Sequence, residues 1–332
     1  MNNDAFAATC DSFAREAPGF LPIYAGPESA AGEHQFLFFA KPEMFDHAVK
    51  STYEARMRLF FETLSRFDLT VERVVALSGG FLDEHGIMSE HYGVIDRIAR
   101  DPIRSLSAEG QSAFRSLFGR ELPDTAVGGI QYLALHPELD PAVLAQEWLD
   151  RGFEKLSGGS YCQHLPGENI YLFNAFYPQM LRHYTRASAR IHVFVLRGSE
   201  SWKRVRSGFI GTTDPSNAQA GSIRRELLNR HEELGIPVIS ANLNGAHLSA
   251  GPIEGLVELL RFTDDRTSEP PSPESFIFGA QLRSLFSLEQ VERLLGNPDL
   301  DSGGSTVSVF DLTEELDASD AVARLEELKS LI

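Results

Sequence analysis

Short apolar runs and amphipathic stretches alternate along the chain, which is typical of a mixed α+β protein. Residues 34–40 form a compact apolar run that predicts a buried strand, and residues 71–77 and 191–196 predict two more. Apolar positions recur every three or four residues across residues 43–67, which predicts a helix. Further helices are expected at 83–100, 141–156, 171–184, 199–206, 226–234 and 252–262, and a fourth strand at 237–241. This order predicts a βαββαβ sheet with helices on one face.

The two ends of the chain lie outside this pattern. Residues 1–33 precede the first predicted strand and form an N-terminal extension. Residues 264–275 are rich in Pro, Ser and acidic residues, which is typical of a linker. Residues 276–332 form an acidic C-terminal segment with two expected helices, at 280–295 and 318–331. A length of 332 residues allows roughly two domains of ordinary size.

The composition limits the partners of the protein. Thirty Lys and Arg against 47 Asp and Glu give a net charge of −17. A field of this sign repels phosphate backbones and anionic lipids, so we expect neither nucleic-acid binding nor membrane binding. The N-terminus lacks the apolar run of a signal peptide, and the two cysteines, Cys10 and Cys162, are too few for a disulfide framework or a zinc site. We therefore expect a soluble, cytoplasmic protein.

The strongest candidate for chemistry is His247, which lies in a Gly/Ala/Ser setting just before a predicted helix. Ser249 is close enough in sequence to hydrogen-bond a group that His247 carries. Glu258 lies two turns into the helix, where its carboxylate could reach one imidazole nitrogen and fix the tautomer. Such a histidine can be a nucleophile, a general base or a metal ligand. The alternative is a loop histidine capped by a serine.

A second candidate is the loop from Gly208 to Gly221, which ends at Arg224. Glycines, hydroxyls and an arginine at a helix start offer backbone N–H groups, Thr hydroxyls and a guanidinium to an anion. The alternative is a surface loop rich in turn-forming residues.

Six short motifs, in the same order, resemble those of the nucleoside diphosphate kinase family. They are Lys41-Pro42, Glu90-His91-Tyr92, Gly211-Thr212-Thr213-Asp214-Pro215, Gly221-Ser222-Ile223-Arg224, Asn244 with His247 and Ser249, and Glu258 eleven residues past the histidine. The resemblance covers about residues 34–102 and 168–263 and implies a kinase-like domain at 34–263 with an insertion at 103–167. The implied fold is a ferredoxin-like βαββαβ antiparallel sheet with helices, plus a helical insertion and a C-terminal helical appendage.

The resemblance implies a ping-pong phosphotransferase. His247 would take the γ-phosphate of ATP or another nucleoside triphosphate, become a phosphohistidine, and pass the group to a nucleoside diphosphate or a specialised small-molecule acceptor. Mg²⁺ would bridge the phosphates with few direct protein ligands. The implied catalytic residues are His247, Glu258, Tyr92 and Lys41, and the implied substrate-binding residues are Lys41, Thr213, Arg224, Asn244, Arg206 and Ser249.

The chain also departs from the family pattern. Ser207 stands where the family has an arginine, with Arg206 next to it as a replacement, and Ala250 stands where an acidic residue is usual. Glu43-Met44 replaces the Asp-Gly that follows Lys-Pro. These losses leave open an alternative, a catalytically weak nucleotide-binding homologue that serves as a regulatory or interaction module. The insertion favours a particular acceptor, and with the C-terminal segment it favours a monomer or an oligomer smaller than the family hexamer.

The charge distribution points to the same region. Residues 182–225 hold nine Lys and Arg against two acidic residues, a balance of +7 in an acidic protein. Among the other histidines, His192 is expected to be structural and His34 to lie at the surface. His164 could line the cleft if the insertion folds over it.

Overall fold

The computed structural model describes residues 2–15, 19–26, 32–301 and 306–332. Parts of the predicted N-terminal extension (1, 16–18 and 27–31) and of the C-terminal segment (302–305) lie outside the described residues. The chain divides into two compact units, one formed by residues 1–81 and 188–332 and the other by residues 82–187. In the described residues no helix is long and apolar enough to cross a membrane.

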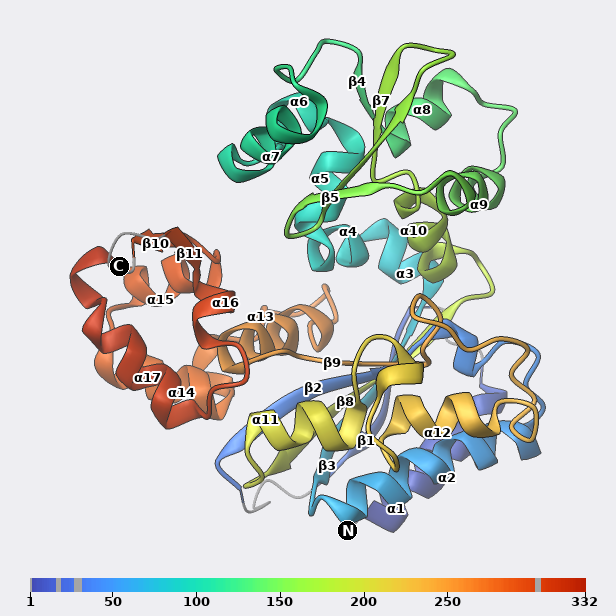
Figure 1. Ribbon diagram of the computed structural model, residues 1–332. Helices are drawn as coiled ribbons and strands as arrows, with labels where there is room; N and C mark the ends of the chain where they lie inside the picture. Colours follow the sequence, from blue (N-terminus) through green and yellow to red (C-terminus); the bar gives the residue numbers. More distant parts are fainter. Residues whose placement is uncertain (1, 16–18, 27–31, 302–305) are drawn as a thin grey trace. The chain divides into compact units, whose positions relative to one another are not determined.

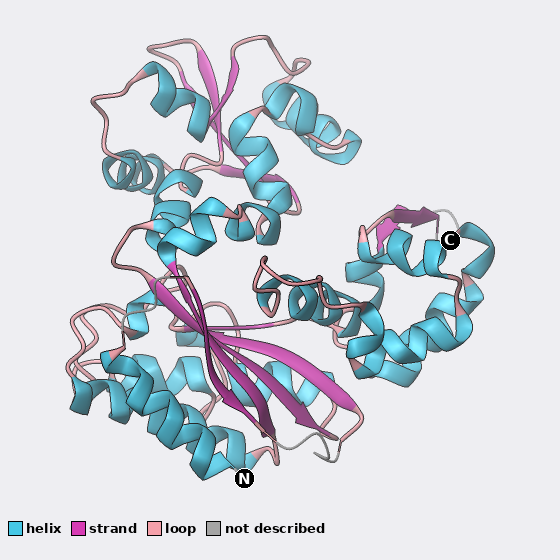
Figure 2. Ribbon diagram, turned by 180° about the vertical axis from the view of Figure 1, so that it is seen from behind, coloured by secondary structure: helices cyan, strands magenta, loops and turns pink. Residues whose placement is uncertain are grey.

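The first unit is built on a five-stranded antiparallel sheet with the strand order β1-β3-β8-β2-β9 (Figures 1 and 2). The strands are β1 (Phe20–Ala25), β2 (His34–Ala40), β3 (Thr70–Ser78), β8 (Arg190–Gly198) and β9 (Ala246–Leu248). The three strands predicted at 34–40, 71–77 and 191–196 are confirmed as β2, β3 and β8. The edge strand β1, which the sequence analysis does not predict, comes from the N-terminal extension.

The predicted fourth strand at 237–241 is wrong, because these residues are irregular and the strand at that edge is β9. Strand β9 holds only three residues and begins directly after Gly245, which has a φ of 79°. A segment this short carries no measurable alternation. The edge strand next to β2 therefore lies inside the His247 motif itself.

Helices cover both faces of the sheet, so the expectation of helices on one face is wrong (Figure 1). On one face Phe38 packs against Phe60 and Phe194, with ring centroids 5.3 and 5.5 Å apart. On the other face Phe39 packs against Phe262, 5.4 Å away. The helices of the first face are α1 (Asn2–Asp11), α2 (Lys50–Arg66), α11 (Trp202–Arg204), which continues as a π-helix over Val205–Ile210, and α12 (Ile223–Arg230); α13 (Pro252–Phe262) covers the other.

The C-terminal segment belongs to the first unit. It is mostly helical, as expected, with a small two-stranded antiparallel sheet: α14 (Ile277–Leu285), α15 (Leu288–Leu295), β10 (Asp299–Asp301), β11 (Thr306–Ser308), α16 (Val309–Thr313) and α17 (Ala318–Glu327). Hydrogen bonds join it to the rest of the first unit. The N–H of Ile277 donates to Gln35 Oε1 at 2.7 Å, and Asp317 Oδ1 accepts from the N–H of Trp202 at 2.8 Å.

The second unit has its own four-stranded sheet with the order β4-β7-β6-β5. Its strands are β4 (Ala126–Gly128), β5 (Glu154–Ser157), β6 (Ser160–Leu165) and β7 (Ile170–Phe173). The predicted helical insertion at 103–167 therefore also holds three of these strands, and a helix starting at residue 171 is wrong. Its helices are α4 (Ile87–His91), α5 (Gly93–Arg100), α6 (Pro102–Ser105), α7 (Ala108–Phe118), α8 (Gly129–Leu135), α9 (Pro141–Arg151) and α10 (Tyr177–Thr185), and α3 (Gly79–Glu84) crosses the boundary.

Candidate functional site

His247 is held in the middle of strand β9, opposite Phe39 of β2. The two rings stack, with centroids 4.6 Å apart and an interplanar angle of 23°. Gly245 makes the turn into the strand: with φ at 79°, an added Cβ would lie 2.3 Å from Leu227 Cδ1. The backbone before His247 therefore requires glycine, and the imidazole has a fixed plane.

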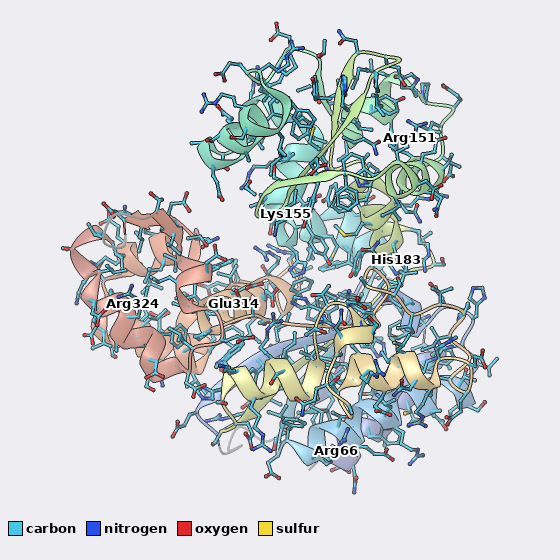
Figure 3. All side chains as sticks on the ribbon, in the orientation of Figure 1. Arg66, Arg151, Lys155, His183, Glu314 and Arg324 are labelled. Carbon is cyan, nitrogen blue, oxygen red and sulfur yellow. The ribbon has the colours of Figure 1, made fainter. Side chains whose placement is uncertain are left out.

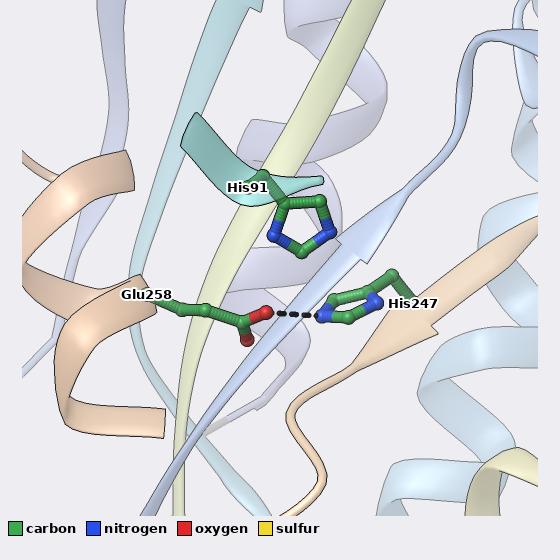
Figure 4. A group of neighbouring side chains, drawn as sticks. All are labelled: His91, His247 and Glu258. Atoms are coloured by element: carbon green, nitrogen blue, oxygen red, sulfur yellow. Dashed lines mark hydrogen bonds and ion pairs between the residues drawn. The ribbon is translucent and has the colours of Figure 1, made fainter. Parts of the chain in front are cut away.

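Glu258 contacts the imidazole of His247 (Figure 4), and Ser249 hydrogen-bonds the same carboxylate. One carboxylate oxygen of Glu258 lies 2.8 Å from His247 Nε2, and the other accepts a 2.6 Å hydrogen bond from Ser249 Oγ. The Glu258 side chain is 1% exposed and that of His247 is 16% exposed. A buried carboxylate at Nε2 favours the tautomer that carries its proton there, which leaves the in-plane lone pair on Nδ1. The chain thus orients one nitrogen of His247 for chemistry.

Lys41, Asn244 and Glu43 join the end of β2 to the turn before β9. Lys41 Nζ donates to Asn244 Oδ1 at 2.7 Å, and Glu43 Oε1 accepts from the N–H of Gly245 at 2.8 Å. Burial lowers the pKa of Lys41 to about 8, with Glu43 raising it and Arg224 lowering it further. Residues 42–44 form a 3₁₀ turn, so α2 begins at Lys50 and the predicted start at residue 43 is wrong. Glu43 departs from the family motif, but its carboxylate holds the turn before β9 in place.

Two arginines bind the outer edge of strand β9, on either side of His247. Arg224 Nη2 donates to the carbonyl of Ala246 at 3.0 Å, and Arg206 Nη1 donates to that of Leu248 at 3.2 Å. Alternate carbonyls of an edge strand point away from its single neighbour, so these two oxygens are open to the guanidinium groups. Arg224 also donates from Nη1 to the carbonyl of Gly211 at 2.9 Å, which ties the Gly/Thr loop to the same edge. Two cationic groups therefore flank the imidazole-bearing residue.

The Gly/Thr loop meets this network through its backbone. The carbonyl of Thr213 accepts from Asn244 Nδ2 at 3.0 Å, and the Thr213 side chain is exposed. Gly211 has a φ of 85°, and an added Cβ would lie 2.5 Å from Ser222 Oγ. Ser207, the residue in the family's arginine position, is exposed and donates to the carbonyl of Lys203 at 2.8 Å.

Two further acidic groups belong to this neighbourhood, and the sequence motifs single out neither. Glu254 lies one turn before Glu258 on α13, and its pKa is raised by burial and by the Glu258 charge, against the lowering effect of Arg206. Glu314 comes from the C-terminal segment, and its Oε1 lies 3.5 Å from Arg206 Nη2. Spacing on α13 could have found Glu254, but no local pattern could have found Glu314.

Tyr92 is the predicted site residue that the first unit does not contain. It lies in the second unit between α4 and α5, where its hydroxyl is 3.3 Å from that of Tyr184. Its catalytic role stays a prediction. His164, also in the second unit, is exposed and stacks on Tyr171 with centroids 4.4 Å apart.

His192 is fully buried, as expected of a structural residue, with Nδ1 2.8 Å from Tyr53 Oη. Burial lowers its pKa to about 3, so it stays neutral. The surface prediction for His34 is wrong, because its side chain is buried at the end of β2 beside Asp317.

Comparison with known proteins adds little to this geometry. No family model matches the sequence, and no curated protein matches it. Among solved structures, an NDP kinase from Pyrobaculum aerophilum is similar at a TM-score of 0.30 and 18% identity, over 69% of this chain and 94% of that one. A likeness this weak establishes neither fold nor activity. The chemistry of the site must therefore be inferred from the contacts around His247.

Proposed function

We propose that the protein is a phosphotransferase that moves the γ-phosphate of a nucleoside triphosphate through a phosphohistidine at His247. The observation that carries the proposal is the oriented imidazole: Glu258 lies 2.8 Å from Nε2, and arginines bind the carbonyls on both sides of the residue. Phosphoryl transfer needs positioning and charge compensation more than covalent work from the protein. We assign both tasks to residues of the first unit.

The strand order supports a relationship to the ferredoxin-like fold. Without the edge strand β1, the sheet reads β9-β2-β8-β3, which is the fourth, first, third and second strand in chain order. A βαββαβ chain with antiparallel neighbours gives this order. We propose on this basis, together with the six motifs, that the first unit is a diverged nucleoside diphosphate kinase-like domain.

The first half-reaction follows from the tautomer. The Nδ1 lone pair of His247 forms a bond to the γ-phosphorus, while the bond from that phosphorus to the bridging oxygen breaks and the nucleoside diphosphate leaves with the electron pair. The phosphorylated imidazole keeps its proton on Nε2 and becomes cationic, and the Glu258 carboxylate at 2.8 Å stabilises it. In the second half-reaction an anionic phosphate oxygen of an acceptor diphosphate attacks the phosphorus, and neutral His247 is restored.

Substrate-binding roles follow from position. We assign the phosphates to Arg224 and Arg206, with the Thr213 hydroxyl, and the sugar hydroxyls to Lys41 and Asn244. Ser249 supports Glu258, as its 2.6 Å hydrogen bond indicates. Mg²⁺ would neutralise phosphate charge when it is bound. Because Glu258 is engaged by His247 and Ser249, and Glu43 by Gly245, we expect the ion to be held by the phosphates rather than by these carboxylates.

The test is incubation with radiolabelled ATP and Mg²⁺. Acid-labile, base-stable label on the wild type that is absent from His247→Ala supports the proposal. His47→Asn is the matched control, because His47 is exposed and its φ of 55° suits asparagine. A chase with nucleoside diphosphates and candidate metabolites then identifies the acceptor. Rapid discharge by common diphosphates contradicts a specialised acceptor.

One observation favours the second candidate, a nucleotide-binding module with weak catalysis. Ser207 replaces an expected arginine, and the neighbouring Arg206 is already paired with Glu314. Nucleotide binding without any label on His247 would establish that alternative.

A further inference from the structure

Glu314 belongs to the C-terminal segment (Figure 3) and contacts Arg206 at the edge of the proposed site. Glu314 Oε1 lies 3.5 Å from Arg206 Nη2, while Nη1 of the same guanidinium donates to Leu248 at 3.2 Å. The third nitrogen, Nε, is buried and has no hydrogen-bond partner among the described residues. One guanidinium is therefore shared between the strand of His247 and a carboxylate from a distant part of the chain.

Backbone contacts fix the position of Glu314. The N–H of Glu315 donates to the carbonyl of Ala250 at 2.9 Å, in the loop that follows the His247 motif. An added Cβ on Gly251 would lie 2.5 Å from the carbonyl oxygen of Thr313, so the two backbones are in direct contact. Asp317 holds the N–H of Trp202 at 2.8 Å, at the start of the helix that leads to Arg206. The chain on both sides of Glu314 is thus held at this edge.

We propose that Glu314 competes with the phosphates of the substrate for Arg206 and thereby lowers the nucleotide affinity of the site. This inference rests on the proposed function. The ion pair is long, and its side chains are 24% and 47% exposed, so it is weak enough for a ligand to break. A phosphate oxygen pair offers the guanidinium two parallel charge-assisted hydrogen bonds, which a carboxylate at 3.5 Å does not. The C-terminal segment is therefore an internal competitor for the substrate anion.

The experiment compares ADP binding by calorimetry in the wild type, Glu314→Gln and the matched control Glu315→Gln. Glu315 is exposed, and the control substitution removes the same charge one residue away. The hydrogen bond from the N–H of residue 315 to the carbonyl of Ala250 is kept. We expect Glu314→Gln to bind ADP roughly two- to fivefold more tightly, the range for releasing an exposed ion pair. The control should stay within the wild-type value, and Arg206→Gln should abolish the gain when it is combined with Glu314→Gln.

A second readout needs no nucleotide. The rate at which phenylglyoxal modifies Arg206, followed by peptide mass spectrometry, should rise in Glu314→Gln and remain unchanged in Glu315→Gln. An equal modification rate in all three proteins overturns this inference but leaves the proposed function standing. An equal gain in ADP affinity for Glu314→Gln and Glu315→Gln does the same. If no variant binds ADP although the modification rate changes, the proposed function fails and the competition fails with it.

Discussion

Replacing Lys41 by Met should make the first unit more stable than in the wild type, and the gain should be larger at neutral pH than at alkaline pH. The pKa of Lys41 is lowered from 10.5 to about 8, chiefly because the ammonium is buried. Each pKa unit corresponds to about 1.4 kcal/mol, so carrying the charge below pH 8 costs the folded state about 3 kcal/mol. Between pH 8 and 10.5 the unfolded chain holds a proton that the folded chain has lost, and the stability of the wild type therefore rises with pH. The Met variant has no such dependence.

The magnitude can be measured as a difference. The advantage of Lys41→Met over the wild type should shrink by about 2 kcal/mol between pH 7.5 and 10. Its absolute size at pH 7.5 is reduced by about 1 kcal/mol because Asn244 Oδ1 loses the 2.7 Å hydrogen bond from Lys41. Lys203→Met, at an exposed position, is the control and should show no change with pH.

Tryptophan fluorescence makes the assay specific for the first unit. The chain has two tryptophans, Trp148 in the second unit and Trp202 in the first, both about 1% exposed. A Trp148→Phe background leaves Trp202 as the reporter of urea unfolding. A difference in free energy of unfolding that is constant with pH, or that grows toward pH 10, would refute the idea that Lys41 is held with a lowered pKa.

Three other predictions test the site and the assembly. Glu258→Gln should slow labelling of His247 by about 10- to 100-fold, because a charge-assisted hydrogen bond to Nε2 is lost and the amide favours the wrong tautomer. Single-turnover labelling measures this rate, and an unchanged rate contradicts the proposed role of Glu258. Gly245→Ala should destabilise the first unit by about 1–3 kcal/mol, because a Cβ would lie 2.3 Å from Leu227 Cδ1. Urea unfolding followed at Trp202 measures this loss, and a variant as stable as the wild type contradicts the prediction. Light scattering should give a mass below that of six 36.8 kDa chains, and a hexamer would refute the smaller assembly.

The sequence predicts the long buried elements of the first unit well. Strands β2 and β8 are largely apolar because both faces of the sheet are covered, and such runs are easily recognised. Strand β3 is recognised by its β-branched residues. Helix α13 has a clear apolar stripe and a proline in its first turn. The pairing of His247 with Glu258 follows from spacing, since α13 returns the carboxylate toward the strand it follows.

Other features depend on contacts between distant residues and leave no local pattern. Strand β9 is defined by pairing with β2, and Glu314 reaches Arg206 over more than 100 residues of chain. In the second unit, β5 and β6 are short and partly polar, so their period of two is hidden. Asn174 has a φ of 47° and binds three backbone groups, and this tertiary role stops the helix predicted from residue 171.

The edge position of β9 links stability to chemistry in this protein. An edge strand exposes carbonyls that favour pairing with another chain, and charged side chains commonly protect it. Here Arg224 and Arg206 protect the edge by binding Ala246 and Leu248, and the same contacts bring two cations to the residue between them. Replacing either arginine therefore removes a hydrogen bond that protects the strand edge, together with the proposed phosphate ligand. A loss of activity in such a variant identifies a phosphate ligand only when Arg224→Lys or Arg206→Lys, which keeps the charge and one donor to the carbonyl, restores the unfolding midpoint without restoring nucleotide affinity.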